Sequence, residues 1–281
     1  MRRIIKDNPI KGLSFLYSNV FGRIILKFLV ETPFVSKLSG LFLDTKISKI
    51  LIGPFVKKNN INLDDYVKTK YDSFNDFFIR KIKEEKRPVN KEKNAFISPC
   101  DSKLMCYRID KNTIFNIKNT NYDINSLIQD ESLAKQYANG YVLVFRLSPD
   151  DYHRYCFVDD GTINRNYKIK GKFHTVNPIV YDKFCVFKEN TRECTVLDTQ
   201  NFDKVLYVEV GALLVGKIKN IITQGKITKG SEKGYFMYGG STIVIIVKKN
   251  ILKIDDDIIK NSENGFETYV KYGEKIAEKI K

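Results

Sequence analysis

A glycine-rich stretch near the C-terminus leads into a serine that could act as a nucleophile. Residues 229–242 contain the pair Gly239-Gly240 immediately before Ser241. Glycine adopts backbone conformations that other residues resist, so the peptide can bend toward the serine hydroxyl. That oxygen could then attack the Gly240 carbonyl in an N-to-O acyl shift. A plain hairpin whose hydroxyls satisfy turn hydrogen bonds gives the same pattern, and this stretch alone does not separate the two.

Two further stretches could supply a base and a carboxylate. The loop within Leu147–Cys156 carries two acids, an arginine and His153, which suits a base or an anion partner. The chain has only two histidines, so imidazole chemistry must come from His153 or His174. A third stretch places Asp101 between two apolar segments, where a carboxylate could orient a histidine. Asp101, His153 and Ser241 could together form a catalytic triad, which is recognised by its geometry. The sequence alone cannot show that these three side chains contact one another.

The elements that must position these residues are mostly strands. From Ala95 onward, short runs rich in Val, Ile, Tyr and Phe alternate with Gly, Asn and Asp turns. The predicted strands are Tyr141–Leu147, Tyr167–Val176, Val205–Val215, Tyr235–Tyr238 and Thr242–Val247. Helix is predicted within residues 61–90, within residues 120–139 and from Phe266 to Lys281. The expected fold class is α+β: an amphipathic helical N-terminus on a mostly antiparallel β catalytic domain, hybrid or barrel-sandwich-like, with a C-terminal helix.

The N-terminal residues combine positive charge with apolar faces. The net charge is +15, and residues 1–60 hold eleven Lys/Arg against three Asp/Glu. Apolar residues recur at helical spacing through residues 10–30, where Arg23 and Lys27 rule out a membrane-spanning helix. A second apolar stretch runs from Leu38 to Phe55. Both suit helices that lie in a membrane interface, although packing on the main domain is the alternative.

Charge and cysteine content limit the partners. A basic surface attracts nucleic acid or anionic lipid. Here the charge lies on amphipathic stretches and not along strands with exposed aromatic residues, which favours lipid over nucleic acid. A β domain that has lost catalysis and serves as a membrane-bound interaction protein is disfavoured, because the candidate triad is intact. The five cysteines form no CxxC pair, and we expect reduced thiols inside a cell.

Taken together, these stretches resemble one enzyme family, the pyruvoyl-dependent phosphatidylserine decarboxylases of bacterial type. The likeness runs from about residue 30 to about residue 250, and it is specific because its motifs occur jointly and in order. The motifs are Thr32–Lys37, Ser73–Arg80 with Arg87-Pro88, Ser98–Asp101, Asp151–Arg154, Thr175–Pro178, Val208–Gly216 and Phe236–Thr242.

The resemblance implies a proenzyme that cuts itself between Gly240 and Ser241, into a β chain of residues 1–240 and an α chain of residues 241–281. Ser241 then becomes a covalent pyruvoyl cofactor. Its carbonyl forms a Schiff base with the amine of phosphatidylserine and acts as an electron sink while carbon dioxide leaves and phosphatidylethanolamine forms. The resemblance gives His153 as the base of self-cleavage, oriented by Asp101. No metal is implied.

One position departs from the family pattern. Many members have a second histidine three residues after the first, where this chain has Cys156. His153 is therefore the default base, and His174 is the alternative, or serves the decarboxylation step. Cys156 is less suited, since an unperturbed thiol has a pKa of about 8.5.

The same resemblance predicts how the enzyme meets its substrate. Residues 1–60 form basic membrane-associating helices, and residues 61–281 form the catalytic domain. The partner is phosphatidylserine in an anionic membrane surface, with the protein peripheral on the cytoplasmic side of the cell membrane. The resemblance also allows a homodimer and gives no role to nucleic acid. Arg154, Lys172 and the N-terminal lysines are candidates for holding the headgroup phosphate.

Overall fold

The structure is a computed structural model that describes residues 2–5, 33–117, 120–172, 174, 186–211, 218–238 and 241–280. Several sequence predictions therefore lie outside the described residues. They are the helix within residues 10–30, the Gly239-Gly240 pair and the Thr175–Pro178 motif.

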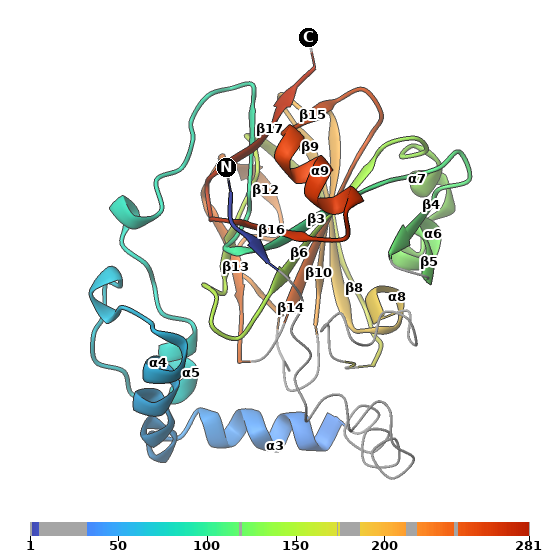
Figure 1. Cartoon of the computed structure of the whole chain (residues 1–281). Helices are drawn as coiled ribbons and strands as arrows, with labels where there is room; N and C mark the ends of the chain where they lie inside the picture. The colour runs from blue at the N-terminus through green and yellow to red at the C-terminus, as the bar shows by residue number, and fades with distance from the viewer. Residues whose placement is uncertain are drawn as a thin grey trace.

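Nine antiparallel strands form the central sheet, in the order β1, β16, β3, β6, β14, β10, β9, β8 and β12 (Figure 1). In that order they span Ile4–Ile5, Glu267–Val270, Ser102–Arg108, Tyr141–Leu147, Ser241–Val247, Lys204–Val210, Arg192–Thr199, Gly161–Ile169 and Gly225–Ile227. Strand β14 lies between β6 and β10, and all seven of its residues are buried. Alternate side chains of a strand point to opposite faces, so both faces of the sheet must be covered at β14.

Smaller elements cover the two faces. One core contains residues of two three-stranded sheets and of α9, namely β7 (Arg154–Cys156), β11 (Ile218–Asn220), β13 (Glu232–Phe236), β2 (Ala95–Ile97), β15 (Leu252–Ile254), β17 (Lys275–Lys279) and α9 (Asp256–Glu263). The other core contains residues of a hairpin and three short helices, namely β4 (Ile114–Ile117), β5 (Thr120–Asp123), α6 (Ile124–Ile128), α7 (Glu131–Lys135) and α8 (Val186–Glu189). Ile243 and Ile245 of β14 lie in the first core, and Val244 and Ile246 lie in the second.

The N-terminal helices form a third cluster at one side of the molecule. They are α3 (Pro33–Leu43), η1 (Lys46–Leu51), α4 (Ile52–Asn59), η2 (Leu63–Asp65), α5 (Phe74–Phe78) and η3 (Glu84–Lys86). Figure 1 shows α3 passing beneath one end of the large sheet, with α4 and α5 beside it. Side chains of α3, α4 and α5 pack on one another around Phe74, Phe77 and Phe78. No helix in the described ranges is long and apolar enough to cross a bilayer.

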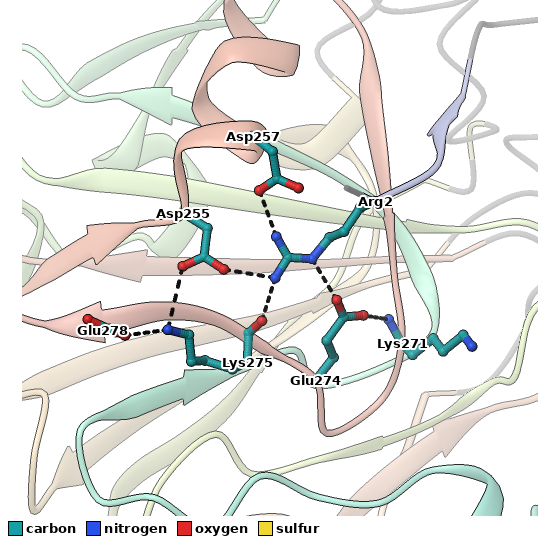
Figure 2. Close-up of polar contacts among 7 residues, drawn as sticks. All are labelled: Arg2, Asp255, Asp257, Lys271, Glu274, Lys275 and Glu278. Carbon is teal, nitrogen blue, oxygen red and sulfur yellow. Dashed lines mark hydrogen bonds and ion pairs between the residues drawn. The ribbon is translucent and has the colours of Figure 1, made fainter.

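The chain ends are tied together. Strand β1 pairs with β16, and the Arg2 guanidinium donates to Asp255, Asp257 and Glu274 at 2.6–2.8 Å (Figure 2). It also donates to the backbone carbonyl of Lys275 at 2.6 Å. Residues near the start of the chain are therefore bound to the segment that follows Ser241.

The α+β prediction is confirmed: the sheets are antiparallel and the helices few. Among the described residues the large sheet stays open, from β1 at one edge to β12 at the other, and so forms no closed barrel. The strand predicted for Tyr141–Leu147 has the bounds of β6, and the one predicted for Thr242–Val247 begins one residue earlier.

The helix predicted from Phe266 to Lys281 is wrong. This segment forms β16 and β17, and the helix in this part of the chain is α9, ten residues earlier. Its Lys, Glu and Ala content favours helix in isolation, but β17 pairs with β15 and β2, and such pairing overrides local propensity.

Other boundaries also moved. Strand β8 starts at Gly161 and ends at Ile169, well before the predicted end at Val176. Most of its side chains are partly or fully exposed, so it lacks the apolar alternation that marks a strand. The predicted helix within residues 61–90 is three short helices, η2, α5 and η3.

Candidate active site

Ser241 opens β14 in the interior of the protein. It lies opposite Leu147, the last residue of β6, and its side chain is fully buried. The neighbouring Thr242 lies between Arg146 of β6 and Val210 of β10. Strand β6 thus fixes the backbone of β14 up to Ser241, and β10 fixes it up to Thr242, which positions the serine hydroxyl.

His153 meets this hydroxyl. The loop that follows β6 brings the imidazole back over the strand end, where Nδ1 lies 3.3 Å from Ser241 Oγ. The other ring nitrogen, Nε2, is 2.9 Å from the backbone carbonyl of Ser148. A carbonyl oxygen only accepts hydrogen bonds, so Nε2 carries the proton and Nδ1 presents its lone pair. This is the tautomer that can take a proton from Ser241.

Burial keeps the His153 imidazole neutral. The side chain is fully buried, and this desolvation lowers its pKa to about 3, against the opposing effect of the Ser148 hydrogen bond. The positive charges of Arg80 and Lys103 lower it further. A neutral imidazole is ready to accept a proton near pH 7, although such a low pKa makes it a weak base.

A buried ion pair holds the loop that carries His153. The carboxylate of Asp151 accepts hydrogen bonds from Lys103 Nζ at 2.5 Å and from the backbone N–H of Ser148 at 2.7 Å. Burial raises the pKa of Asp151 to about 6, and Lys103 opposes that rise. The pair fixes Ser148, whose carbonyl in turn orients the imidazole.

Aromatic side chains close the site. The Phe78 ring lies 4.2 Å from the imidazole, centre to centre, and 5.2 Å from the ring of Tyr238. Tyr238 also contacts Phe74 at 5.1 Å and precedes Ser241 by three residues. The serine and histidine therefore lie behind an aromatic layer that keeps water away from them.

Asp101, expected to orient His153, has other partners. Its carboxylate accepts hydrogen bonds from Arg87 Nε at 2.8 Å, from Arg87 Nη2 at 2.5 Å and from the backbone N–H of Tyr272 at 2.8 Å. Both ring nitrogens of His153 are taken by Ser148 and Ser241. The structure thus brings two of the three predicted residues together and directs the third to an arginine.

Cys156 occupies the position where many relatives have a second histidine. Its backbone N–H donates to the carbonyl of Pro99 at 2.9 Å, close to the segment of Asp101. Burial raises the pKa of the Cys156 thiol to about 12, so the group is a neutral thiol and not a base. The described cysteines, Cys156 among them, are all buried and free of disulfides.

His174 is held at the same end of the sheet. Its backbone N–H donates to Asn190 Oδ1 at 2.9 Å, and its carbonyl accepts from Asn190 Nδ2 at 2.7 Å. Asn190 also donates to the carbonyl of Gly211, one residue beyond the end of β10. The His174 Nε2 atom lies 3.6 Å from a carboxylate oxygen of Glu189.

Sequence reasoning missed several residues that shape the site. Ser148 and Lys103 lie within or beside recognised stretches, but nothing in their type pointed to orienting the base. Phe78 and Arg80 belong to the Ser73–Arg80 motif, which indicated the family without indicating a role. Within the described ranges, no group of three or more His, Cys, Asp or Glu side chains could hold a metal.

Comparison with known proteins adds an independent finding. The family model for phosphatidylserine decarboxylase matches residues 74–278. The chain is 50% identical over 266 residues to phosphatidylserine decarboxylase proenzyme 2 of Clostridium acetobutylicum, covering 95% of this chain and 91% of that protein. It is 41% identical to the phosphatidylserine decarboxylase proenzyme of Clostridium botulinum strain Hall, covering 95% and 92%. The Clostridium novyi protein of the same name is 38% identical over 285 residues, covering all of this chain and 96% of that protein.

Proposed function

Since the chain belongs to the phosphatidylserine decarboxylase family of enzymes, we propose that it converts phosphatidylserine to phosphatidylethanolamine and carbon dioxide with a pyruvoyl group made from its own Ser241. The group would arise by self-cleavage between Gly240 and Ser241. The observation that carries this proposal is the buried contact of 3.3 Å between Ser241 Oγ and His153 Nδ1.

The geometry supports His153 as the base of self-cleavage. Nδ1 accepts the hydroxyl proton as Ser241 Oγ attacks the Gly240 carbonyl, and the proton passes to the nitrogen that leaves. The bond from Gly240 to nitrogen is replaced by an ester to Ser241 Oγ. Ser148 holds the ring in the required tautomer throughout, since its carbonyl engages the Nε2 proton.

The aromatic layer favours the next step. An ester exposed to water would be hydrolysed and would leave an ordinary N-terminal serine. Behind Phe78 and Tyr238 the ester is shielded, so loss of the Ser241 Cα proton and departure of the Gly240 carboxylate can compete. The resulting N-terminus loses ammonia on hydrolysis and becomes the pyruvoyl group. When formed, that group supplies a carbonyl that draws electrons from the bond to the departing carboxylate.

The two proposed chains would stay together after the cut. Strand β14 remains hydrogen-bonded between β6 and β10, and β16 remains between β1 and β3. The α chain, residues 241–281, thus contributes β14 and β16 to a sheet whose other strands belong to the β chain. The expected homodimer stays a prediction, which light scattering after size-exclusion chromatography would test.

Exposed apolar side chains support peripheral binding to a membrane through residues 1–60. Large exposed hydrophobic residues gather on α3 and η1, which we call the apolar patch, comprising Leu38, Leu41, Phe42, Ile47, Ile50 and Leu51. Ile47 and Ile50 are 74% and 75% exposed. Exposed lysines lie beside them, at Lys46 and Lys49. Apolar burial together with attraction to anionic lipid gives two membrane-binding signals, and the cytoplasmic leaflet is the anionic one.

The apolar patch is connected to the active site. Helix α5 packs against α3 and η1 on one side, and its residue Phe78 packs against His153 on the other. A lipid bound at the patch would thus lie next to the elements that cover Ser241.

Intact mass spectrometry of the purified protein tests the proposal. We expect two chains, residues 1–240 and 241–281, with the shorter one lacking a free N-terminal amine. The Ser241→Ala variant should stay uncut and inactive. Thr242→Val is the matched control, because the Thr242 hydroxyl is buried with no hydrogen-bond partner in the described part of the chain, and it should cleave normally. A wild-type chain that never splits on membranes, or cleavage of Ser241→Ala, would contradict the proposal.

A further inference from the structure

Arg80 is a buried arginine whose guanidinium is largely unpaired. The residue is 2% exposed, and neither Nε nor Nη2 has a hydrogen-bond partner among the described residues. Its Nη1 reaches the Phe77 carbonyl only at 3.5 Å, the outer limit of a hydrogen bond. The guanidinium carbon lies 4.6 Å from the ring centres of Tyr66 and Phe77. Aromatic faces surround the charge, but no described carboxylate pairs with it.

Other buried arginines are fully engaged. Arg192, also 2% exposed, donates to four backbone carbonyl groups. Arg146 pairs with Glu267, and the half-buried Arg87 pairs with Asp101. Burying a charged group without a partner costs roughly several kcal/mol of folding free energy. Proteins therefore seldom bury an unpaired charge unless it has a function. Among the described residues, Arg80 keeps Nε and Nη2 free, the two nitrogens that form one planar fork for an oxyanion.

Arg80 lies on the segment that joins the N-terminal helices to the catalytic pair. It follows Phe78, which contacts His153, by two residues. The backbone between them is anchored beside His153, because Arg154 Nε donates to the carbonyl of Ile79 at 2.8 Å. On the other side, Phe77 packs against Phe55 of α4 at 5.8 Å. Arg80 thus belongs to a segment that contacts both the helix cluster and His153.

We propose that Arg80 binds the phosphodiester of the lipid substrate, an assignment that rests on the proposed function. Phosphatidylserine offers two anions, a phosphodiester and a carboxylate. The carboxylate loses its charge as carbon dioxide departs, so a cation held on it would stabilise the ground state more than the transition state. The phosphodiester keeps its charge throughout. A buried guanidinium therefore suits the phosphodiester, which it can hold in substrate and product alike.

Entry of the lipid requires the cover of Arg80 to move. Both free nitrogens are sealed in the uncut chain, with the Tyr66 ring on one face. The phosphodiester would replace these aromatic contacts on part of the guanidinium with two charge-assisted hydrogen bonds.

The test compares Arg80→Met and Arg80→Lys with Arg108→Met in the self-cleaved enzyme. Arg108 is exposed, stacks on Tyr141 at 5.0 Å, and lies at the end of β3 away from Ser241, so its replacement removes the same charge and a similar ring contact elsewhere. With monomeric dihexanoyl phosphatidylserine as substrate, we expect KM to rise about 10- to 100-fold in Arg80→Met, while kcat changes by less than about threefold. Arg80→Lys should be intermediate, because lysine keeps the charge without the fork. Arg108→Met should match the wild type.

A second readout identifies which anion is bound. Dihexanoyl phosphatidylglycerol carries a phosphodiester but neither amine nor carboxylate. Its inhibition constant should rise in Arg80→Met by the same factor as KM. Thermal unfolding of Arg80→Met should occur at or above the wild-type temperature, since an unpaired buried charge is removed.

Several outcomes would overturn the assignment. An unchanged KM in Arg80→Met would remove Arg80 from the substrate site. A raised KM with an unchanged inhibition constant would move the contact to the carboxylate. Loss of self-cleavage in both Arg80 variants, or a lowered unfolding temperature in both, would show that Arg80 has a structural role instead. If the wild type cleaves itself but does not decarboxylate phosphatidylserine, both the proposed function and this inference are wrong. If the wild type does decarboxylate it, the Arg80 variants test the role of Arg80 alone.

Discussion

Arg2 and Arg80 are both largely withdrawn from water, yet their surroundings differ in kind. Arg2 donates to three carboxylates and a backbone carbonyl, and Lys275 pairs with Asp255, one of the same acids (Figure 2). Burial lowers the pKa of Arg2, but hydrogen bonds to Asp255 and Glu274 outweigh it and leave that pKa raised. Arg80 has aromatic rings and one long hydrogen bond.

The two regions differ in the same way beyond their arginines. Around Arg2, opposite charges join the start of the chain to the segment after Ser241. Around Arg80 lie an imidazole held neutral by burial, a buried hydroxyl and a layer of aromatic rings. Paired charges serve stability, whereas groups left without compensation mark the place where a reaction or a ligand completes the site.

Replacing the base should have the largest effect. We expect His153→Gln to slow self-cleavage by about 10²- to 10⁴-fold, because the Ser241 hydroxyl loses its proton acceptor. His174→Gln should cleave at the wild-type rate, and any loss of decarboxylation in it would assign it to the later step. The measurement is the fraction of cut chain against time by gel or mass spectrometry. The opposite pattern, with His174 needed for cleavage, would reverse the two roles.

The apolar patch on α3 and η1, next to the active site, should provide most of the membrane binding. Leu41→Asp and Ile50→Asp should each weaken binding to anionic vesicles about 10- to 100-fold, the cost of keeping one large apolar side chain in water. The control is Ile221→Asp, since Ile221 is similarly exposed, at 55%, but lies outside the apolar patch. Vesicle flotation measures the binding. If all three variants lose vesicle binding equally, the apolar patch is not the membrane-binding surface.

The charged cluster at the chain ends should affect stability and leave kinetics alone. Arg2→Gln should lower the free energy of unfolding by about 1–3 kcal/mol, since three partly buried carboxylates lose their shared partner. KM for short-chain phosphatidylserine should not change. The adjacent and exposed Arg3 provides the control Arg3→Gln. Chemical denaturation of the cut enzyme measures the free energy of unfolding of each variant. An equally large decrease in Arg3→Gln would show that the loss of one positive charge, and not of these contacts, lowers the stability.

The smallest effect expected is that of pH on self-cleavage. His153 acts as a base only when neutral, and with a pKa of about 3 it stays neutral down to mildly acidic pH. The rate at pH 5.5 should lie within about twofold of that at pH 8, whereas an ordinary imidazole would lose about tenfold. A tenfold loss centred near pH 6.5 would contradict the buried, neutral form.

Stability must be followed in the same experiment. The unfolded chain binds a proton at His153 below about pH 6.5, while the folded chain does not until about pH 3. The free energy of unfolding therefore falls with decreasing pH across that range, by at most about 1.4 kcal/mol per pH unit from this group. Circular dichroism at each pH identifies any rate loss that is only unfolding.

The positions of the central strands could be predicted from the sequence, because these strands are largely apolar on both faces. Strands β6 and β14 are mostly apolar with sharp ends, and their bounds were predicted to within a residue. Strand β8 is polar and β17 is rich in helix-forming residues, so their local patterns misled. They are strands because their neighbours pair with them, and that information lies elsewhere in the chain.

By itself, the sequence determined the set of chemical groups: a serine after two glycines, two histidines, one of them in an acidic loop, and a cysteine in place of a further histidine. Only the tertiary structure decided which of them meet. The loop after β6 and the start of β14 are 88 residues apart in the chain, and pairing of the two strands brings His153 to Ser241. The same packing places Asp101 against Arg87 and leaves Arg80 Nε and Nη2 without a hydrogen-bond partner in the described part of the chain. Partners are set by sheet register and burial, which no local pattern of residues encodes.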